Sequence, residues 1–192
     1  MKLKEVNNLI LASSSPRRKE LLSLLKIPFD IIVSDIDESI NLENDLDKEI
    51  ENLSYKKAYA VFKDHQDSIV IGSDTIVILN NKVLGKPKDK EEAKEMLRSL
   101  QDNTHTVLTA VTIISKDKYD TFSIKADVTF NHMDEEEIEE YVNTNEPLDK
   151  AGSYAIQGDG AKYIKQVNGD YYAVIGLPIS EVYNRLKNYM PM

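Results

Sequence analysis

Residues 8–26 read NLILASSSPRRKELLSLLK, and this stretch predicts how the chain begins to fold. The apolar run at 8–12 has the length of a short buried strand, and three serines then turn the chain. Pro16 suits the first turn of a helix, and a serine just before it can cap the free N–H groups of that turn. The stretch therefore predicts a strand, a serine turn and a helix that runs from Pro16 to about Lys26.

The serine turn also has the composition of an anion-binding site. The N-terminus of a helix offers free N–H groups and the positive end of the helix dipole. Serine hydroxyls add donors, and the adjacent Arg17 and Arg18, two of only four arginines in the chain, can make paired contacts with phosphate oxygens. The glycines and the Gly-Lys-Ser/Thr ending of a Walker A loop are absent. A phosphate or carboxylate site is favoured, and the alternative is an inert helix cap with two solvated charges.

The rest of the chain alternates between strand and helix patterns. Apolar runs predict strands at 29–33, 68–72, 75–79, 83–84, 104–115, 119–130, 151–156 and 171–175, with Ser73-Asp74 separating the second of these from the third. Helical spacing of apolar residues predicts helices at 45–64, 89–100 and 179–190. Asp89 with Glu92 predicts a capping box for the second of these helices, and Asp134 with Glu137 predicts one for a further helix. Alternating elements followed by paired strands predict a mixed α/β fold rather than a purely parallel sheet.

Composition excludes several classes of protein. The chain has 192 residues, of which 41% are hydrophobic, and this suits one folded domain or two small lobes that share a core. No apolar run approaches the ~20 residues of a membrane helix, and the N-terminus lacks the apolar segment of a signal peptide, so we expect a cytoplasmic protein without a membrane partner. The absence of cysteine excludes disulfides, thiolate zinc sites and cysteine nucleophiles. The net charge of -9 argues against a nucleic-acid partner.

Three further stretches place polar groups where a reaction can use them. Asp74 lies between two apolar strand segments, where it can be a turn residue, a metal ligand or a general base, and the local sequence does not separate these roles. Lys86 lies in a tight bend between a glycine and a proline, where it can point at a ligand or be an ordinary turn lysine. Gln157 lies in a glycine-rich stretch at 150–160 and can present its amide to the edge of a base. The three histidines show no metal-ligand spacing, so we expect structural or surface roles for them.

Seven stretches, in this order, resemble the Maf family of nucleoside-triphosphate pyrophosphatases, and the resemblance runs nearly from end to end. They are LASSSPRRKELL at 11–22, SDIDES at 34–39, YKKA at 55–58, SDTIVILNNKVLGKP at 73–87, THTVLTAV at 104–111, EPLDKAGSYAIQG at 146–158 and GDYYAVIGLP at 169–178. The loop KAGSYAIQG is similar to that of the branch that acts on dTTP and UTP rather than on 7-methyl-GTP. The chain departs from the family at Ser73, where alanine is usual, and at Gln101-Asp102, where Ser-Gly is usual. These departures remove no charged group from the expected site.

The resemblance implies a Maf/ITPase-like fold, which is a mixed, twisted sheet flanked by helices in two lobes with a central nucleotide cleft. It implies a single Maf-type domain over residues 1–192. The implied reaction is hydrolysis of dTTP and UTP at the α–β phosphoanhydride to the monophosphate and pyrophosphate, with Mg²⁺ or Mn²⁺ as cofactor, in a housecleaning role that can extend to modified pyrimidine nucleotides. The alternative is a nucleotide-binding regulatory protein, linked to septum formation, that does not need turnover. A homodimer is compatible with the sequence.

Residue by residue, the resemblance also assigns the site. The phosphates and the base fall to seven substrate-binding residues, which are Ser13, Arg17, Arg18, Lys57, Thr75, Lys86 and Gln157. In this set Thr75 and Gln157 are the base-side residues, and the others form a basic pocket. Glu38 and Asp74 are the carboxylates and the candidate metal ligands. Asp74 is also the candidate to orient or deprotonate the attacking water, and the sequence does not decide between these two roles for Asp74.

Overall fold

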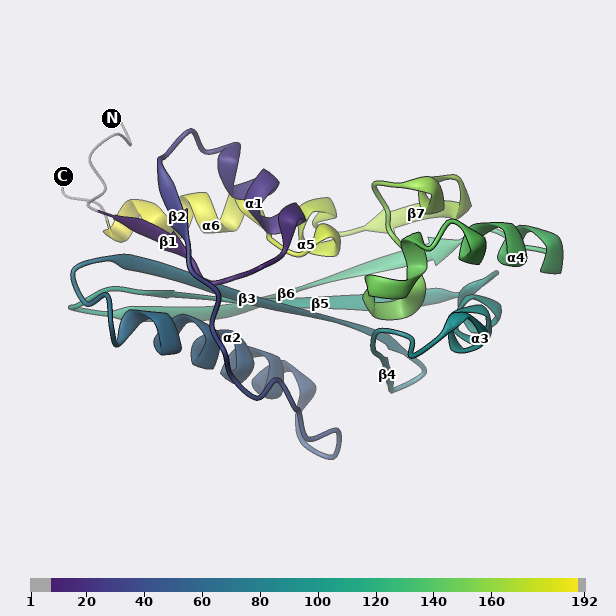
Figure 1. Ribbon diagram of the computed structural model, residues 1–192, viewed down its shortest axis with the longest axis horizontal. Helices are drawn as coiled ribbons and strands as arrows, with labels where there is room; N and C mark the ends of the chain where they lie inside the picture. Colours follow the sequence, from purple (N-terminus) through teal and green to yellow (C-terminus); the bar gives the residue numbers. More distant parts are fainter. Residues whose placement is uncertain (1–7, 190–192) are drawn as a thin grey trace. The chain divides into compact units, whose positions relative to one another are not determined.

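The computed structural model describes residues 8–189 and is shown in Figure 1. Within these residues, backbone hydrogen bonds join seven strands into one mixed sheet in the order β2-β1-β3-β5-β6-β7, and β4 pairs with β3. The strands are β1 (Leu9–Leu11), β2 (Phe29–Ile31), β3 (Ile69–Leu79), β4 (Lys82–Leu84), β5 (Thr104–Ile114), β6 (Tyr119–Phe130) and β7 (Ile164–Asn168). The helices are α1 (Pro16–Ser23), α2 (Leu46–Phe62), α3 (Lys90–Leu100), α4 (Glu135–Asn143), α5 (Tyr171–Ile175) and α6 (Ile179–Leu186). The predicted mixed α/β fold, with a sheet flanked by helices, is confirmed.

By its internal contacts the chain divides into two compact units. The first unit comprises residues 8–74, 109–124 and 176–189, and the second comprises Thr75–Leu108 and Lys125–Ile175. Each unit has a hydrophobic core cluster of its own. None of the helices in residues 8–189 is long and apolar enough to cross a membrane.

In the first unit, β1 is the middle one of three parallel strands. It pairs with β2 on one side and with residues 69–71 of β3 on the other. Figure 1 shows α2 on one face of these strands and α1 and α6 on the opposite face. The residues packed between the strands and α2 form one core cluster, which consists of Ile10, Ala12, Ala58, Val61, Val70 and Ile114. The last residue of β1, Leu11, pairs with Ile71 near the start of β3, so the serine turn emerges next to the residues that follow Ile71.

In the second unit, a tight turn at Asn80 and Asn81 joins β3 to β4. Both residues have positive φ values, 49° and 63°, which asparagine tolerates better than most residues do. Leu79 pairs with Lys82 across this turn. The strands predicted at 75–79 and 83–84 therefore pair with each other as a hairpin.

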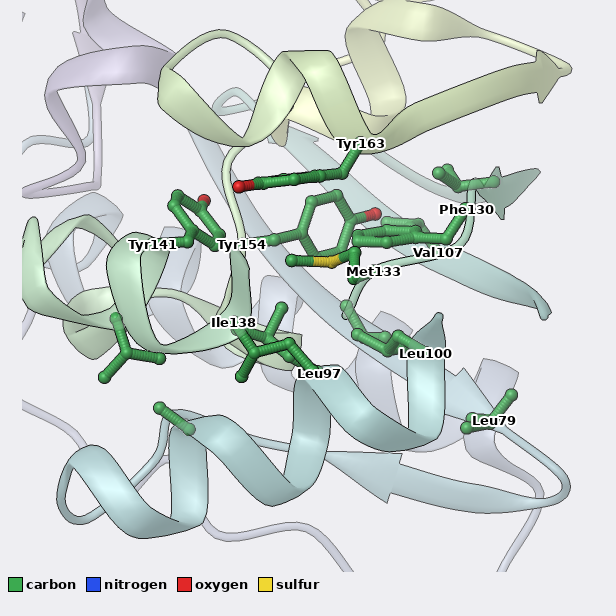
Figure 2. Packing of buried hydrophobic residues seen from close by; sticks show 14 residues of the cluster. Leu79, Leu97, Leu100, Val107, Phe130, Met133, Ile138, Tyr141, Tyr154 and Tyr163 are labelled. Atoms are coloured by element: carbon green, nitrogen blue, oxygen red, sulfur yellow. The ribbon is translucent and has the colours of Figure 1, made fainter. Parts of the chain in front are cut away.

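The core of the second unit lies between its strands and the helices α3 and α4. Figure 2 shows the cluster, with Leu97 and Leu100 of α3 and Ile138 of α4 facing the aromatic rings. The capping box at α4 is confirmed, because the side chains of Asp134 and Glu137 accept hydrogen bonds from each other's backbone N–H groups.

The capping box predicted for α3 is only half correct. The Asp89 carboxylate accepts a hydrogen bond from the Glu92 N–H, as predicted. The Glu92 carboxylate, however, accepts from the N–H of Lys88 rather than from that of Asp89. The donor of this second hydrogen bond is therefore one residue before the expected one, and it lies outside the helix.

The predicted break at Ser73-Asp74 is wrong, because β3 runs without interruption from Ile69 to Leu79. The Ser73 side chain is fully buried, and its hydroxyl donates to the carbonyl of Gly176 at 3.0 Å. The Asp74 carboxylate accepts a hydrogen bond from Lys57. Because other parts of the first unit satisfy both polar side chains, the backbone can stay in the sheet.

The predicted strands at 151–156 and 171–175 are also wrong. Residues Ala151–Ser153 form a 3₁₀ turn in which Gly152 and Ser153 have φ values of 70° and 59°, which lie outside the range of a strand. Residues 171–175 form helix α5, which begins where the Asp170 carboxylate accepts hydrogen bonds from the two N–H groups at 172 and 173. The sequence does not predict β7, whose five residues IKQVN include only two apolar ones.

Two helices are shorter than predicted. Helix α1 ends at Ser23 because the chain reverses before Lys26, which has a φ of 56°. Helix α6 ends at Leu186 and continues as a 3₁₀ turn over Lys187–Tyr189. Its predicted last residue, Met190, lies outside the described residues.

His105 is a buried titratable group in the second unit. It is 2% exposed, and its Nε2 lies 2.7 Å from the hydroxyl of Tyr154. Its ring also packs on Phe130, with the two ring centroids 5.6 Å apart. Burial disfavours the charged imidazolium and lowers the pKa of His105 to about 4. His105 is therefore neutral near pH 7 and has the structural role that its spacing favours.

We expect this buried histidine to make the folded protein sensitive to acid. In the unfolded chain the imidazole takes up a proton near pH 6.5, but in the folded chain only near pH 4. Above pH 6.5, His105 is neutral in both states and does not change the free energy of unfolding. As the pH drops from 6.5 toward 4, only the unfolded chain binds the proton, so the free energy of unfolding falls. When the pH is lowered from about 7 to about 4.5, the free energy of unfolding of the unmodified protein should fall by about 2–3 kcal/mol more than that of His105→Gln. Urea denaturation at the two pH values measures this difference.

The glutamine variant keeps a hydrogen-bonding group for Tyr154 but does not titrate. All carboxylates are common to both proteins, so their contribution cancels in the comparison. Equal losses in the two proteins would show that the burial of His105 does not set its protonation.

Candidate functional site

The serine turn between β1 and α1 folds as a capped helix N-terminus. Ser15 is the N-cap, and its hydroxyl accepts a hydrogen bond from the N–H of Arg18 at 3.4 Å. Ser13 is buried, and its hydroxyl accepts from the Ser15 N–H at 3.2 Å and from Nη1 of Arg18 at 3.3 Å. Pro16 occupies the first helical turn, as predicted. The turn therefore holds the Ser13 hydroxyl against the Arg18 guanidinium group.

Arg18 is fixed to the last segment of the first unit. Its Nε donates to the carbonyl of Gly176 at 2.9 Å. Burial lowers the pKa of Arg18, the charges of Asp74 and Glu38 oppose that shift, and the charge of Arg17 adds to it. Arginine stays charged through a shift of this kind, since its usual pKa is far above neutrality. The first unit thus gathers two arginines close to the two predicted carboxylates.

Lys57 links these two carboxylates. Its side chain is 8% exposed, and its Nζ donates to Oδ1 of Asp74 at 2.5 Å and lies 3.0 Å from Oε1 of Glu38. The Asp74 side chain is 15% exposed and that of Glu38 is 61% exposed. A buried ammonium group requires an opposite charge beside it, and Asp74 supplies most of that within the protein. The structure therefore brings together three of the residues that the family resemblance assigns to the site.

This ion pair depends on a close approach between α2 and β3 at Gly72. A Cβ atom at residue 72 would lie 2.5 Å from the carbonyl oxygen of Ser54 and 2.7 Å from the nitrogen of Ala58. Ala58 follows Lys57 on α2, and Asp74 follows Gly72 by two residues on β3. The missing side chain at Gly72 therefore lets the helix come near enough for the Lys57 ammonium to reach the Asp74 carboxylate.

The other three predicted residues belong to the second unit. Thr75 continues β3 after Asp74, and Lys86 and Gln157 are exposed on loops. The N–H of Gly152 donates to the carbonyl of Gly85 at 3.1 Å, so these two loops are neighbours. Within residues 8–189, however, the structure shows no hydrogen bond between the side chains of Lys86 and Gln157.

The sequence alone does not reveal two hydrogen-bond acceptors that hold parts of the site in place. The carbonyl of Gly176 accepts hydrogen bonds from both Arg18 and Ser73. The carboxylate of Glu146 accepts from the backbone beside Gln157. Both lie in stretches that resemble the Maf family, but a backbone carbonyl carries no residue-specific signal, and a single glutamate in an acidic chain does not stand out.

Glu38 and Asp74 are the groups that suit a divalent cation. Both carboxylates approach the Lys57 nitrogen within 3.0 Å, so they lie close together. Residues 8–189 contain no cluster of three or more histidine, aspartate or glutamate side chains arranged to hold a metal. Mg²⁺ is commonly held by one or two carboxylates and completes its shell with water and substrate phosphates. The pair therefore fits a cation that arrives with a phosphate substrate rather than a closed structural metal site.

Comparison of the sequence with known proteins relates the chain to one family. A family model described as "Maf-like protein" matches residues 8–189. The dTTP/UTP pyrophosphatase of Bacillus cytotoxicus is 50% identical over 180 residues, which cover 94% of this chain and 94% of that protein. The dTTP/UTP pyrophosphatase of Bacillus anthracis is 50% identical over 184 residues, which cover 96% of each. Among solved structures, the Ham1 protein of Staphylococcus aureus matches with a TM-score of 0.47 and 14% identity over 65% of this chain and 72% of that chain.

We expect Gly72→Ala to destabilise the first unit. The new methyl group would meet the backbone of α2, which cannot move aside as a flexible side chain can. The cost of overpacking of this kind is about 1–3 kcal/mol, measurable as a lower urea midpoint. Gly85→Ala is the matched control, because a Cβ at residue 85 has no heavy atom within 4 Å. Equal midpoints for the two variants would mean that α2 does not need the close approach.

Proposed function

The chain belongs to the Maf family and is a nucleoside triphosphate pyrophosphatase, and we propose that it hydrolyses dTTP and UTP to the monophosphate and pyrophosphate. The relatives named for this activity are 50% identical to the chain over nearly its whole length. The observation that carries the proposal is the buried Lys57 between Asp74 and Glu38, in the same unit as the arginines of a helix N-terminus. The family match over residues 8–189 supports treating both units as one functional domain.

The proposed phosphate contacts come from the serine turn and the basic side chains. A triphosphate is strongly anionic, and an acidic protein must concentrate positive charge where it binds one. Ser13, Arg17, Arg18 and Lys57 provide donors in the first unit, and Lys86 is a further donor by family resemblance. Positive groups fixed in place also stabilise the charge that develops on pyrophosphate as it leaves.

The proposed chemical step is attack of water on the α-phosphorus. A bond forms between the water oxygen and this phosphorus, and the bond from the phosphorus to the oxygen that bridges it to the β-phosphorus breaks. Pyrophosphate leaves with that oxygen and its electron pair. Asp74 is the proposed group that orients the water and accepts its proton, because it is largely buried and its charged partner Lys57 holds it in place.

The proposed cofactor is Mg²⁺ or Mn²⁺, held by Glu38 and Asp74 together with the phosphates. When bound, such a cation neutralises phosphate charge and polarises the phosphoryl oxygens. The support in this chain is the pair of carboxylates that approach one nitrogen, Asp74 from strand β3 and Glu38 from the loop between β2 and α2. Lys57 keeps the two carboxylates from repelling each other while no cation is bound.

Thr75 and Gln157 are the proposed contacts to the base. A site that hydrogen-bonds uracil or thymine leaves its own polar groups unpaired when cytosine enters, since the exocyclic amine inverts the donor pattern. The exposure of Gln157 on its loop is compatible with this role. A cytoplasmic location and a homodimer stay predictions.

The first test is pyrophosphate release from dTTP, UTP, CTP, ATP, GTP and 7-methyl-GTP, with Mg²⁺ or Mn²⁺ and with EDTA. We expect release mainly from dTTP and UTP, and only with the cation, because the carboxylate pair needs it to bind phosphate oxygens. Release from 7-methyl-GTP instead would keep the chemistry and contradict the assigned base. Release that continues in EDTA would contradict the cofactor.

Asp74→Asn separates turnover from binding. The amide keeps the size of the side chain but cannot take a proton from water, so kcat should fall by about 10²–10⁴-fold. Nucleotide affinity, measured by calorimetry, should change far less because the arginines remain. If turnover persists in this variant, Asp74 is not the base. If the unmodified protein binds nucleotides without turnover, the regulatory alternative is the better account.

A further inference from the structure

Glu146 accepts three hydrogen bonds, and two of them come from the backbone just after Gln157. Its Oε1 accepts from the N–H of Asp159 at 3.1 Å, and its Oε2 accepts from the N–H of Gly160 at 3.1 Å. Its Oε2 also accepts from the Tyr141 hydroxyl at 2.7 Å. A carboxylate that accepts several such bonds is held in one orientation, and charge strengthens each of them. The backbone just after Gln157 is therefore attached to a fixed group.

The Tyr141 hydroxyl extends this attachment to the other side of Gln157. It donates to Glu146 and accepts a hydrogen bond from the N–H of Ala155 at 3.0 Å. The tyrosine is 2% exposed, and Figure 2 shows its ring among the buried side chains of the second unit. Only residues 156–158 lie between the two attached parts of the backbone.

Two glycines make room for these contacts. A Cβ at Gly158 would lie 1.6 Å from Oε1 of Glu146, and a Cβ at Gly160 would lie 2.4 Å from the hydroxyl oxygen of Tyr141. No side chain fits at either position while the contacts exist. The sequence around Gln157 is therefore adapted to the glutamate and the tyrosine, and not only to a turn.

We propose that Glu146 and Tyr141 form a clamp that positions the Gln157 amide and thereby sets the discrimination between pyrimidine bases. Both are positioning residues, since they act through Gln157 and do not touch the substrate. The inference rests on the proposed function, because it deepens the role given there to Gln157. An exposed side chain on an unattached loop would adopt many orientations, and it could then pair with the donor pattern of the wrong base.

The main test measures kcat/KM for dTTP and for CTP in Glu146→Ala and in Tyr141→Phe. Each variant removes hydrogen bonds to the backbone around Gln157. The ratio of kcat/KM for dTTP to kcat/KM for CTP should therefore fall by about tenfold, mainly through a higher KM for dTTP. A variant that only loses folded protein would lower kcat for both nucleotides by the same factor and leave the ratio unchanged. An unchanged ratio in both variants overturns the proposal.

A double variant tests whether the clamp acts through Gln157. Gln157→Ala alone should lower the same ratio, and adding Glu146→Ala to it should lower the ratio no further. Glu146→Gln keeps one acceptor oxygen and should recover part of the ratio. Glu135→Gln is the matched control, because that carboxylate binds Arg98 on α3, and it should keep the full ratio. An additional loss in the double variant overturns the proposal.

Amide hydrogen exchange gives a readout that needs no substrate. The N–H groups of Asp159 and Gly160 should exchange about tenfold faster in Glu146→Ala, because their acceptor is gone. Unchanged exchange overturns the clamp, whatever the enzyme acts on. If exchange rises but the unmodified protein shows no preference for dTTP or UTP, the clamp stands as a structural feature, while the proposed function and the specificity role built on it both fail.

Discussion

The pairing of Lys57 with Asp74 and Glu38 is the interaction on which the first unit depends. An ammonium group with 8% exposure would destabilise the fold if no opposite charge lay beside it. The pairing requires α2 to come close to β3, which the absence of a side chain at Gly72 permits. It also requires an aspartate in the interior of a strand, where an acidic residue is otherwise unfavourable. The same three charged groups are those to which we assign the chemistry, so the stability of this unit and its reactivity are coupled.

The carbonyl of Gly176 provides a second link within the first unit. It accepts from Arg18 at the start of α1 and from Ser73 in the middle of β3. One backbone oxygen therefore fixes both the arginine of the helix N-terminus and the strand residue beside Asp74. Positively charged and negatively charged groups are held near each other by the protein itself, before any phosphate binds. Such preorganised charges cost no rearrangement when the substrate arrives, and this is the main physical advantage of the arrangement.

The second unit uses a different kind of constraint around Gln157. Glu146 and Tyr141 bind backbone N–H groups on both sides of it, and glycines at 158 and 160 let these side chains approach. Attachment of the backbone on both sides of Gln157 limits the directions in which its side chain can point. A fixed direction suits the recognition of a hydrogen-bond pattern on a base. The charged cluster of the first unit suits phosphate instead, because phosphate is recognised chiefly by charge.

The sequence by itself determined the local features and the family. Ser15 caps α1 by accepting a hydrogen bond from the N–H three residues later, and Asp134 and Glu137 cap α4 across the same spacing. Both pairs are predictable because the two partners lie within one turn. The seven family stretches determined the class of enzyme in the same direct way. The tertiary structure alone decided whether Ser73-Asp74 would break β3, since the partners that satisfy these side chains lie 103 and 17 residues away. The backbone of 151–156 was likewise decided by contacts that a local apolar pattern does not encode, because an apolar run records only that residues are buried and not which conformation buries them.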